Sequence, residues 1–201
     1  MAVIISRQTF VGVDLGQRRD ASTIVAIEQQ QEILVWPEVQ SSTAPVYRWW
    51  FYVRLLERMR LDTPYPEVVK RIRRVLCLPQ MQQMPRTLVV DGTGVGIAVV
   101  DMLHRADLDC RIRPMVITGS TNTGSHLLRN GYESVGRGEL LTWMQILVQR
   151  ERLLIPVRCR EAETLRKEML SLKLTSTTTG EHDDIAFAVA LALWKAKVRL
   201  D

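Results

Sequence analysis

Four aspartates in this chain stand at positions from which their carboxylates could gather around a cation. Asp14 ends one apolar segment, Asp91 ends another, and the pair Asp183–Asp184 opens an apolar stretch near the C-terminus. Carboxylates that converge repel one another unless a cation lies between them. Oxygen-only sites of this kind suit Mg²⁺ or Mn²⁺. Two such ions about 4 Å apart can activate water and stabilise the leaving oxygen in phosphodiester hydrolysis.

Each aspartate taken singly also has an ordinary structural interpretation. An aspartate at the end of a strand is commonly a turn residue, which would account for Asp14. Asp183 is typical of a helix N-cap, and Asp184 in the first turn would complement the helix dipole. The metal-site hypothesis therefore depends on whether the fold brings the four side chains together.

The chain is predicted to open with a three-stranded antiparallel meander. Apolar or β-rich patterns cover residues 9–15, 21–28 and 32–36, and such runs are typical of strands. The linkers between them are short and polar, which favours antiparallel pairing. Asp14 would then lie near the end of the first strand.

Two amphipathic helices are predicted next, over residues 46–60 and 65–78. The first contains four consecutive aromatic residues, Trp49 to Tyr52. Core packing and a base-stacking platform are both open interpretations of that run. The second helix would carry a basic face that is either solvated or in contact with phosphates. The cations of this face, which we expect to bind DNA weakly, are Lys70, Arg71, Arg73 and Arg74.

A strand over residues 86–91 leads through a glycine turn into a helix that includes residues 97–104. This order of strand, turn and helix predicts a parallel and central strand. The turn, Gly92 to Gly96, lacks both the Gly-Lys-Ser/Thr ending of a P-loop and the spacing of a dinucleotide-binding turn. Asp91 is therefore expected at the carboxyl end of a central strand.

The remaining pattern alternates strands with helices. A strand over 111–117 is followed by the polar segment 118–134, which is longer than a routine connector. Helices are predicted over 138–152 and 161–172, with a short strand over 153–155 between them, and a last helix begins near Asp183. The chain therefore predicts one α/β domain over residues 1–201, with a mixed sheet whose first strand neighbours the fourth and helices that flank it.

Composition agrees with a globular protein, since 46% of the residues are hydrophobic. No apolar run approaches the roughly 18 residues that span a membrane, so no membrane is expected. The first residues lack the pattern of a signal peptide. The three cysteines fit neither a disulfide framework nor a zinc site, which favours a cytoplasmic location. The net charge of +5 mildly favours a polyanionic partner.

Three stretches taken in order resemble the nuclease domain of phage terminase large subunits, which belong to the RNase H-like (RuvC-like) superfamily. They are Val11 to Ile24 (VGVDLGQRRDASTI), Val89 to Gly96 (VVDGTGVG) and His182 to Ala192 (HDDIAFAVALA). The segment 135–172 is also similar to the family, with Glu168 in a Leu-x-x-Glu-Met pattern. The resemblance covers nearly the whole chain and implies an RNase H-like fold.

Carried over by position, the resemblance implies that the catalytic metal ligands are Asp14, Asp91, Asp183 and Asp184, with Asp184 the closer match of the last two. They would hold two Mg²⁺ or Mn²⁺ ions. Asp20 corresponds to an additional supporting acid, and His182 to a turn or supporting residue, since these hard ions prefer oxygen. Arg137 corresponds to a basic residue that contacts phosphate.

The resemblance implies endonucleolytic cleavage of double-stranded DNA during viral genome packaging, in the host cytoplasm. Its partners would be a packaging ATPase domain, a small terminase subunit and a portal. The chain contains no Walker A motif, so we expect it to cut DNA without moving it, as an excised domain or a free-standing protein.

Three alternatives remain open from the sequence. A Holliday-junction resolvase would share the metal site. A sugar-kinase or actin-like ATPase is suggested by residues 12–16 and 91–94, although 201 residues are too few for its two domains. A non-catalytic DNA-binding or motor-docking module would lack activity.

Overall fold

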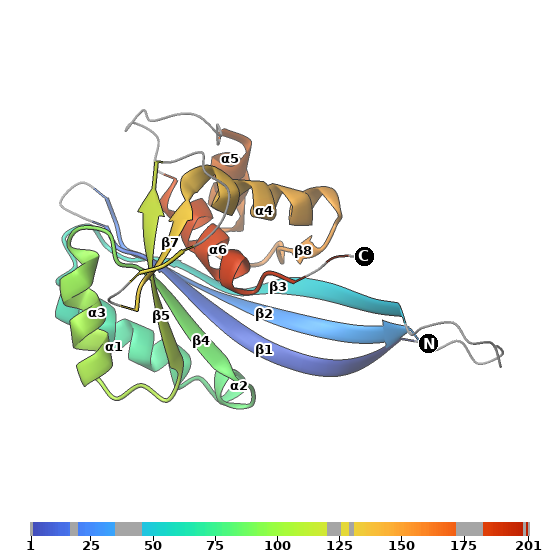
Figure 1. Ribbon diagram of the computed structural model, residues 1–201, viewed down its shortest axis with the longest axis horizontal. Helices are drawn as coiled ribbons and strands as arrows, with labels where there is room; N and C mark the ends of the chain where they lie inside the picture. The colour runs from blue at the N-terminus through green and yellow to red at the C-terminus, as the bar shows by residue number, and fades with distance from the viewer. Residues whose placement is uncertain are drawn as a thin grey trace.

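A computed structural model describes residues 2–16, 20–34, 46–119, 126–128, 131–171, 183–198 and 200. Within these residues, eight strands form one sheet in the order β6-β7-β5-β4-β1-β2-β3-β8. Helices cover both faces of the sheet (Figure 1). This mixed sheet, an antiparallel meander joined to parallel strands, confirms the predicted α/β fold class.

The meander consists of β1 (Ala2–Asp14), β2 (Thr23–Leu34) and β3 (Val46–Arg58). The predicted strands over 21–28 and 32–36 are not separate, since β2 continues from the first into the second as far as Leu34. The polar segment Gln29–Gln31, expected to turn, stays paired with β1 on one side and β3 on the other. Gln29 is buried, and its amide group is hydrogen bonded. Polarity alone therefore did not mark a turn, because these side chains find partners inside the fold.

The predicted helix over residues 46–60 is wrong, since this segment forms β3. Trp49 and Phe51 pack into one core, whereas Trp50 faces the other side of the sheet. Aromatic residues suit a pleated, half-buried surface, and pairing along all of β2 outweighs the apparent helical spacing.

The rings of Trp50 and Tyr52 are in contact with arginines. The guanidinium of Arg152 lies 4.8 Å from the centre of the Trp50 ring, and that of Arg54 lies 4.8 Å from the centre of the Tyr52 ring. Trp50 also donates a 2.8 Å hydrogen bond from Nε1 to Glu32. The aromatic run thus divides between core packing and cation–π contacts.

The parallel part of the sheet is built on β1. The strand β4 (Arg86–Asp91) lies beside β1, β5 (Arg111–Thr118) beside β4, and β7 (Glu133–Gly136) beside β5. The predicted neighbour relation between the first and fourth strands is therefore confirmed. The segment 118–134, expected to be a loop, contains β6 (His126–Leu127), which pairs with the start of β7.

The helices form two layers that Figure 1 shows on opposite sides of the sheet. One layer holds α1 (Tyr65–Leu76), α2 (Pro79–Gln82) and α3 (Gly96–Arg105). The other holds α4 (Arg137–Gln149), α5 (Ala162–Ser171) and α6 (Asp184–Lys195). The predicted helix over 138–152 ends earlier, at Gln149. Glu151 has a positive φ of 55°, and the chain then enters β8 (Leu153–Leu154), which pairs with β3.

Each helix layer encloses its own hydrophobic core, and alternate residues of β1 contribute to each. Val11 and Val13 belong to the core under α1 and α3, and Phe10 to the core under α6.

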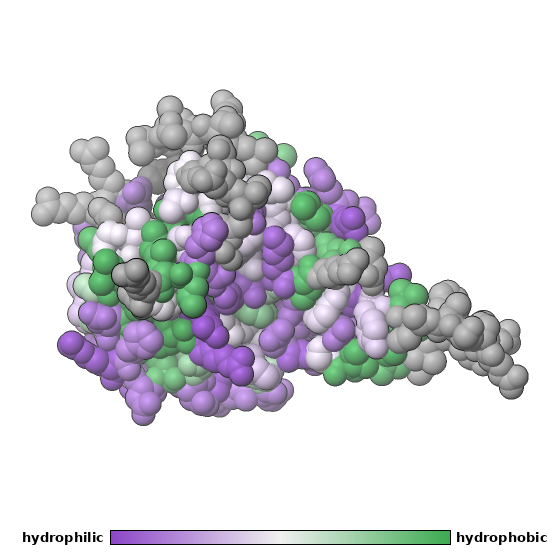
Figure 2. All heavy atoms as spheres, in the orientation of Figure 1, coloured by the Kyte–Doolittle hydropathy of each residue, from purple (hydrophilic) through white to green (hydrophobic). Residues whose placement is uncertain are grey.

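In the part of the chain that the structure describes, no helix has the length and apolar character needed to cross a bilayer. Exposed apolar side chains gather at the end of the meander away from Asp14, where Figure 2 shows hydrophobic surface. They are Val3, Ile4, Ile5, Val46 and Tyr47.

Candidate active site

Asp14 and Asp91 end two adjacent parallel strands at the same level. The parallel register pairs Val13 with Val90, and each aspartate is the next residue of its strand. Val13 and Val90 both pack into the core under α1 and α3. Because successive side chains of a strand point to opposite faces, both aspartates lie on the α6 face of the sheet.

Gly12 allows α6 to lie directly on β1. A Cβ atom at Gly12 would lie 2.1 Å from the carbonyl oxygen of Ala188. The carbonyl oxygen of Ala196, the residue directly after α6, accepts a 2.7 Å hydrogen bond from the Gln29 side chain. Gln29 pairs with Gln8 near the middle of β1. The helix therefore runs antiparallel to β1, and its first turn lies over the carboxyl end of that strand.

Asp14 interacts electrostatically with every other predicted acid of the site. Its pKa lies well above the ordinary value of 3.8, first because the side chain is buried. Neighbouring negative charges raise the pKa further, in the order Asp91, Asp184, Asp183 and Asp20. Burial also raises the pKa of Asp91, although hydrogen bonds from Thr93 lower it. The fold thus gathers Asp14, Asp91, Asp183 and Asp184 into one partly buried region, with the exposed Asp20 nearby.

The row of side chains continues across the meander. Asp14 pairs with Thr23, and Thr23 pairs with Arg58, so all three lie on the α6 face. The Oγ1 atom of Thr23 and the Nε atom of Arg58 are buried without a hydrogen-bond partner in the described parts of the chain. Buried polar atoms without partners are rare in folded proteins and are expected where an ion, water or ligand binds. The unusual polar atoms of this sheet therefore cluster beside the acids.

Glu168 of α5 joins this site, although the pattern of aspartates gave it no role. The residue is buried, with 5% of its surface exposed. Its Oε2 atom accepts a 2.9 Å hydrogen bond from the backbone N–H of Ala186, in the first turn of α6. Its Oε1 atom pairs with Arg58, whose Nη2 atom lies 3.9 Å from Oδ2 of Asp184. The sequence signals for this role were the Leu-x-x-Glu-Met pattern that contains Glu168 and the presence of a carboxylate among the apolar positions of an amphipathic helix.

Asp183 occupies the N-cap position of α6, as expected, but its side chain makes no capping hydrogen bond. It accepts a 2.7 Å hydrogen bond from Arg137 instead. The guanidinium of Arg137 also lies 4.0 Å from the centre of the Phe187 ring. The capping interpretation of the Asp183 side chain is therefore wrong, because Glu168 supplies the cap from another helix.

The predicted basic face of α1 is separated from the acids by the sheet, since α1 packs on the opposite face (Figure 1). Arg71 donates hydrogen bonds to both carboxylate oxygens of Glu57, and Lys70 pairs with Glu67. The side chains of Arg73 and Arg74 are exposed. DNA binding by this face, and by Arg137, stays a prediction. His182 lies outside the described residues.

The donor chemistry of the site fits a hard divalent cation. In the described ranges, no three histidine, cysteine, aspartate or glutamate side chains stand close enough together to hold a metal ion. The acids nevertheless present only oxygen ligands, which Mg²⁺ and Mn²⁺ prefer. The neighbouring charges that raise the pKa of Asp14 also indicate an excess of negative charge, which a cation would offset.

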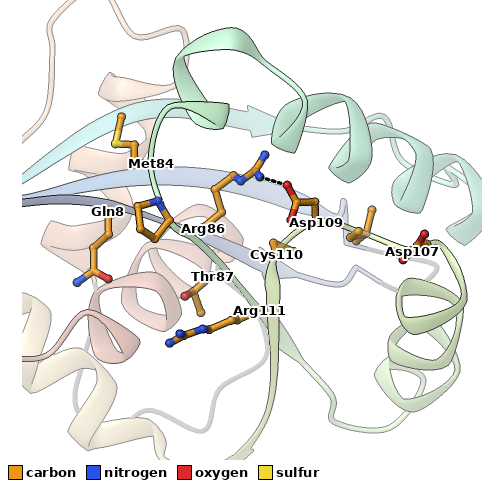
Figure 3. Close-up of a pocket in the computed structure, with 10 residues that line it drawn as sticks. Gln8, Met84, Arg86, Thr87, Asp107, Asp109, Cys110 and Arg111 are labelled. Carbon is orange, nitrogen blue, oxygen red and sulfur yellow. Dashed lines mark hydrogen bonds and ion pairs between the residues drawn. The ribbon is translucent and has the colours of Figure 1, made fainter.

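A separate cavity lies at the opposite end of the same strands (Figure 3). Its volume is about 720 Å³, and it is lined by Arg86, Asp109 and Cys110 among others. Arg86 pairs with Asp109 at 2.6 Å, and burial raises the pKa of the Cys110 thiol to about 11. The thiol is therefore protonated at neutral pH and is a weak nucleophile, so this cavity shows no comparable reactive group.

No protein-family model matches the chain, and no curated protein matches it either. Among solved structures, the chain is similar to RuvC from Thermus thermophilus. The two share 15% sequence identity, the alignment covers 94% of this chain and 93% of that one, and the TM-score is 0.37.

Proposed function

We propose that this protein is a metal-dependent endonuclease that hydrolyses phosphodiester bonds of double-stranded DNA. The observation that carries the proposal is the placement of Asp14 and Asp91 side by side at the ends of two parallel strands, beneath the helix turn that begins with Asp184. Three carboxylates from three separate elements in one partly buried region are costly to a fold unless cations offset their charge. Their convergence therefore points to function.

Within this proposal, Asp14, Asp91 and Asp184 would hold two Mg²⁺ or Mn²⁺ ions, with Asp183 beside them. When bound, such ions supply an activated water molecule and stabilise the charge of the scissile phosphate. The chain itself contributes the positions of the ligands. Two of them stand at the ends of paired strands and the third in the first turn of a packed helix, and sites on such rigid elements are held more precisely than sites on loops.

The finer assignment is cleavage of DNA during viral genome packaging. It is supported by the resemblance of residues 11–24, 89–96 and 182–192 to terminase nuclease domains. In that role the protein would act in the host cytoplasm with a packaging ATPase, a small terminase subunit and a portal.

The proposal is tested by plasmid cleavage with Mg²⁺, Mn²⁺, Ca²⁺ or EDTA. We expect cleavage with Mg²⁺ or Mn²⁺ and none with EDTA. The variant Asp184→Ala should cleave at least about a thousandfold more slowly, because removing a metal ligand removes several kcal/mol of transition-state stabilisation. The matched control is Asp109→Ala, which removes an aspartate at the opposite end of the strands and should keep wild-type activity.

Two results would contradict the proposal. Cleavage that persists in EDTA or in Asp184→Ala would exclude the acids as the metal site. Absence of cleavage by folded protein with every metal would favour a non-catalytic DNA-binding module. A four-way DNA junction, assayed beside a linear duplex, distinguishes the two candidate substrates. A strong preference for cutting the junction would favour junction resolution over duplex cleavage as the activity.

A further inference from the structure

Arg58 places a positive charge between two carboxylates at the edge of the acidic site. Its Nη2 atom is in close contact with Oε1 of Glu168 and lies 3.9 Å from Oδ2 of Asp184. The side chains of Arg58, Glu168 and Asp184 are only 26%, 6% and 13% exposed. Charges in such a poorly solvated place interact more strongly than charges in water. The carboxylate that holds Arg58 therefore affects the charge at Asp184.

Glu168 is fixed in place by a second contact. Its other carboxylate oxygen accepts the backbone N–H of Ala186 at 2.9 Å, two residues after Asp184. The same side chain thus caps α6 and binds Arg58. A carboxylate anchored on the helix turn that carries Asp184 can hold the guanidinium at a defined distance from Asp184.

Arg58 could bind Asp184 more closely than it does at 3.9 Å. Its Nε atom is buried without a hydrogen-bond partner in the described segments, and its Nη2 atom is already near Asp184. Arginine binds a carboxylate most strongly through two parallel hydrogen bonds. Such a pair would occupy the carboxylate oxygens that a divalent cation needs.

We infer that Glu168 is a positioning residue that holds Arg58 at its present 3.9 Å from Asp184 and prevents a closer, two-hydrogen-bond pair that would compete with a divalent cation for the Asp184 carboxylate. The inference rests on the proposed function and adds a regulator of its metal site. In a folded protein without the Glu168 charge, Arg58 would pair with Asp184 and compete with the metal.

The decisive variant is Glu168→Gln, because its amide oxygen can still accept the N–H of Ala186 while its charge is lost. We expect the dissociation constant for Mn²⁺ to rise at least about tenfold, in line with other residues that orient metal ligands. Arg58→Gln should bind Mn²⁺ at least as tightly as the wild type, because the competing cation is gone. The double variant should return to within a few-fold of the wild type.

This reversal in the double variant distinguishes positioning from a loss of structure. If Glu168 acted only through stability, adding a second substitution would leave Mn²⁺ binding as weak as in Glu168→Gln or weaken it further. The matched control is Glu163→Gln on the same helix, where the glutamate pairs with Arg166 at 3.6 Å and is 70% exposed. It should leave Mn²⁺ binding unchanged.

The measurement is calorimetric titration of the DNA-free protein with Mn²⁺, with circular dichroism melting curves to establish that each variant is folded. Equal affinity of Glu168→Gln and wild type would overturn the inference and leave the metal site itself intact. A double variant as weak as Glu168→Gln would also overturn it. If folded wild-type protein failed to bind Mn²⁺ at all, the proposed function would fail and the inference with it.

Discussion

Replacing Asp14 with asparagine is expected to abolish cleavage and at the same time to raise the melting temperature of the metal-free protein. Asparagine has nearly the same shape, so the packing beneath α6 is kept. It removes a charge that is buried and surrounded by other carboxylates. We expect cleavage to slow at least about a thousandfold. The melting temperature should rise by a few degrees, since about 1 kcal/mol corresponds to roughly 2–4 °C in a domain of this size.

The pH dependence of this effect follows from the direction of the pKa shift. The pKa of Asp14 is higher in the folded protein than its ordinary value of 3.8, so the folded state binds this proton more tightly than the unfolded state. The resulting stability is fully present below the unfolded pKa and is lost as the pH rises through the folded pKa. Asp14→Asn removes that loss. Its advantage in EDTA should therefore be larger at about pH 7.5 than at about pH 4.5.

Thermal melts at both pH values, with and without Mn²⁺, test this prediction. Excess Mn²⁺ should reverse the order, because ligand binding stabilises the folded wild type and not the variant. Asp109→Asn serves as the control, since its carboxylate is 98% exposed, and it should change neither cleavage nor the pH profile. A lower melting temperature for Asp14→Asn in EDTA would contradict this prediction. It would show that the contacts of the Asp14 carboxylate stabilise the metal-free fold more than repulsion from the other acids destabilises it.

A single methyl group at Gly12 is expected to disrupt both the fold and the site. In Gly12→Ala the new Cβ atom would lie 2.1 Å from the carbonyl oxygen of Ala188 and 3.1 Å from the Cβ atom of Ala192. Neither the strand nor the helix can give way locally, so α6 must move away from β1. We expect a loss of free energy of unfolding above the roughly 1–3 kcal/mol of an ordinary overpacked core. Cleavage should fall steeply because the shift also displaces Asp184.

Urea unfolding and plasmid cleavage check this prediction together. The matched control is Gly138→Ala in α4, where an added Cβ atom meets nothing within 4 Å. Because alanine favours helix over glycine by up to about 1 kcal/mol, this control should be neutral or slightly stabilising. Wild-type stability in Gly12→Ala would show that α6 can sit further from β1 than the structure places it.

The carboxyl ends of β1 and β4 could be predicted because their signals are local. An apolar run that ends in Asp14, and another that ends in Asp91 before a glycine turn, each specify a strand and its end without reference to the rest of the chain. The third strand of the meander could not be predicted in this way. The apolar residues of Val46–Arg58 suit a helix as well as a strand, and only pairing with β2 over its whole length decides between them.

The same limit explains why the roles of Arg58 and Glu168 were missed. In a helix over residues 46–60, Arg58 would have no fixed relation to Asp14. In β3 it stands in one row with Thr23 and Asp14. Glu168 meets Arg58 across 110 positions of the chain, and no local pattern describes such a pair. Motifs therefore predicted the acids of the candidate site, and strand register determined which side chains surround them.

Because the chain is synthesised from its N-terminus, α6 can pack on β1 only after β1 and β4 have emerged. Asp14 and Asp91 emerge early and can be placed by β1 and β4, but Asp184 follows on the last helix of the described chain. A nascent protein therefore lacks the third acid of the proposed site until α6 docks over Gly12. Under the proposed function, cleavage therefore has to await the docking of this helix.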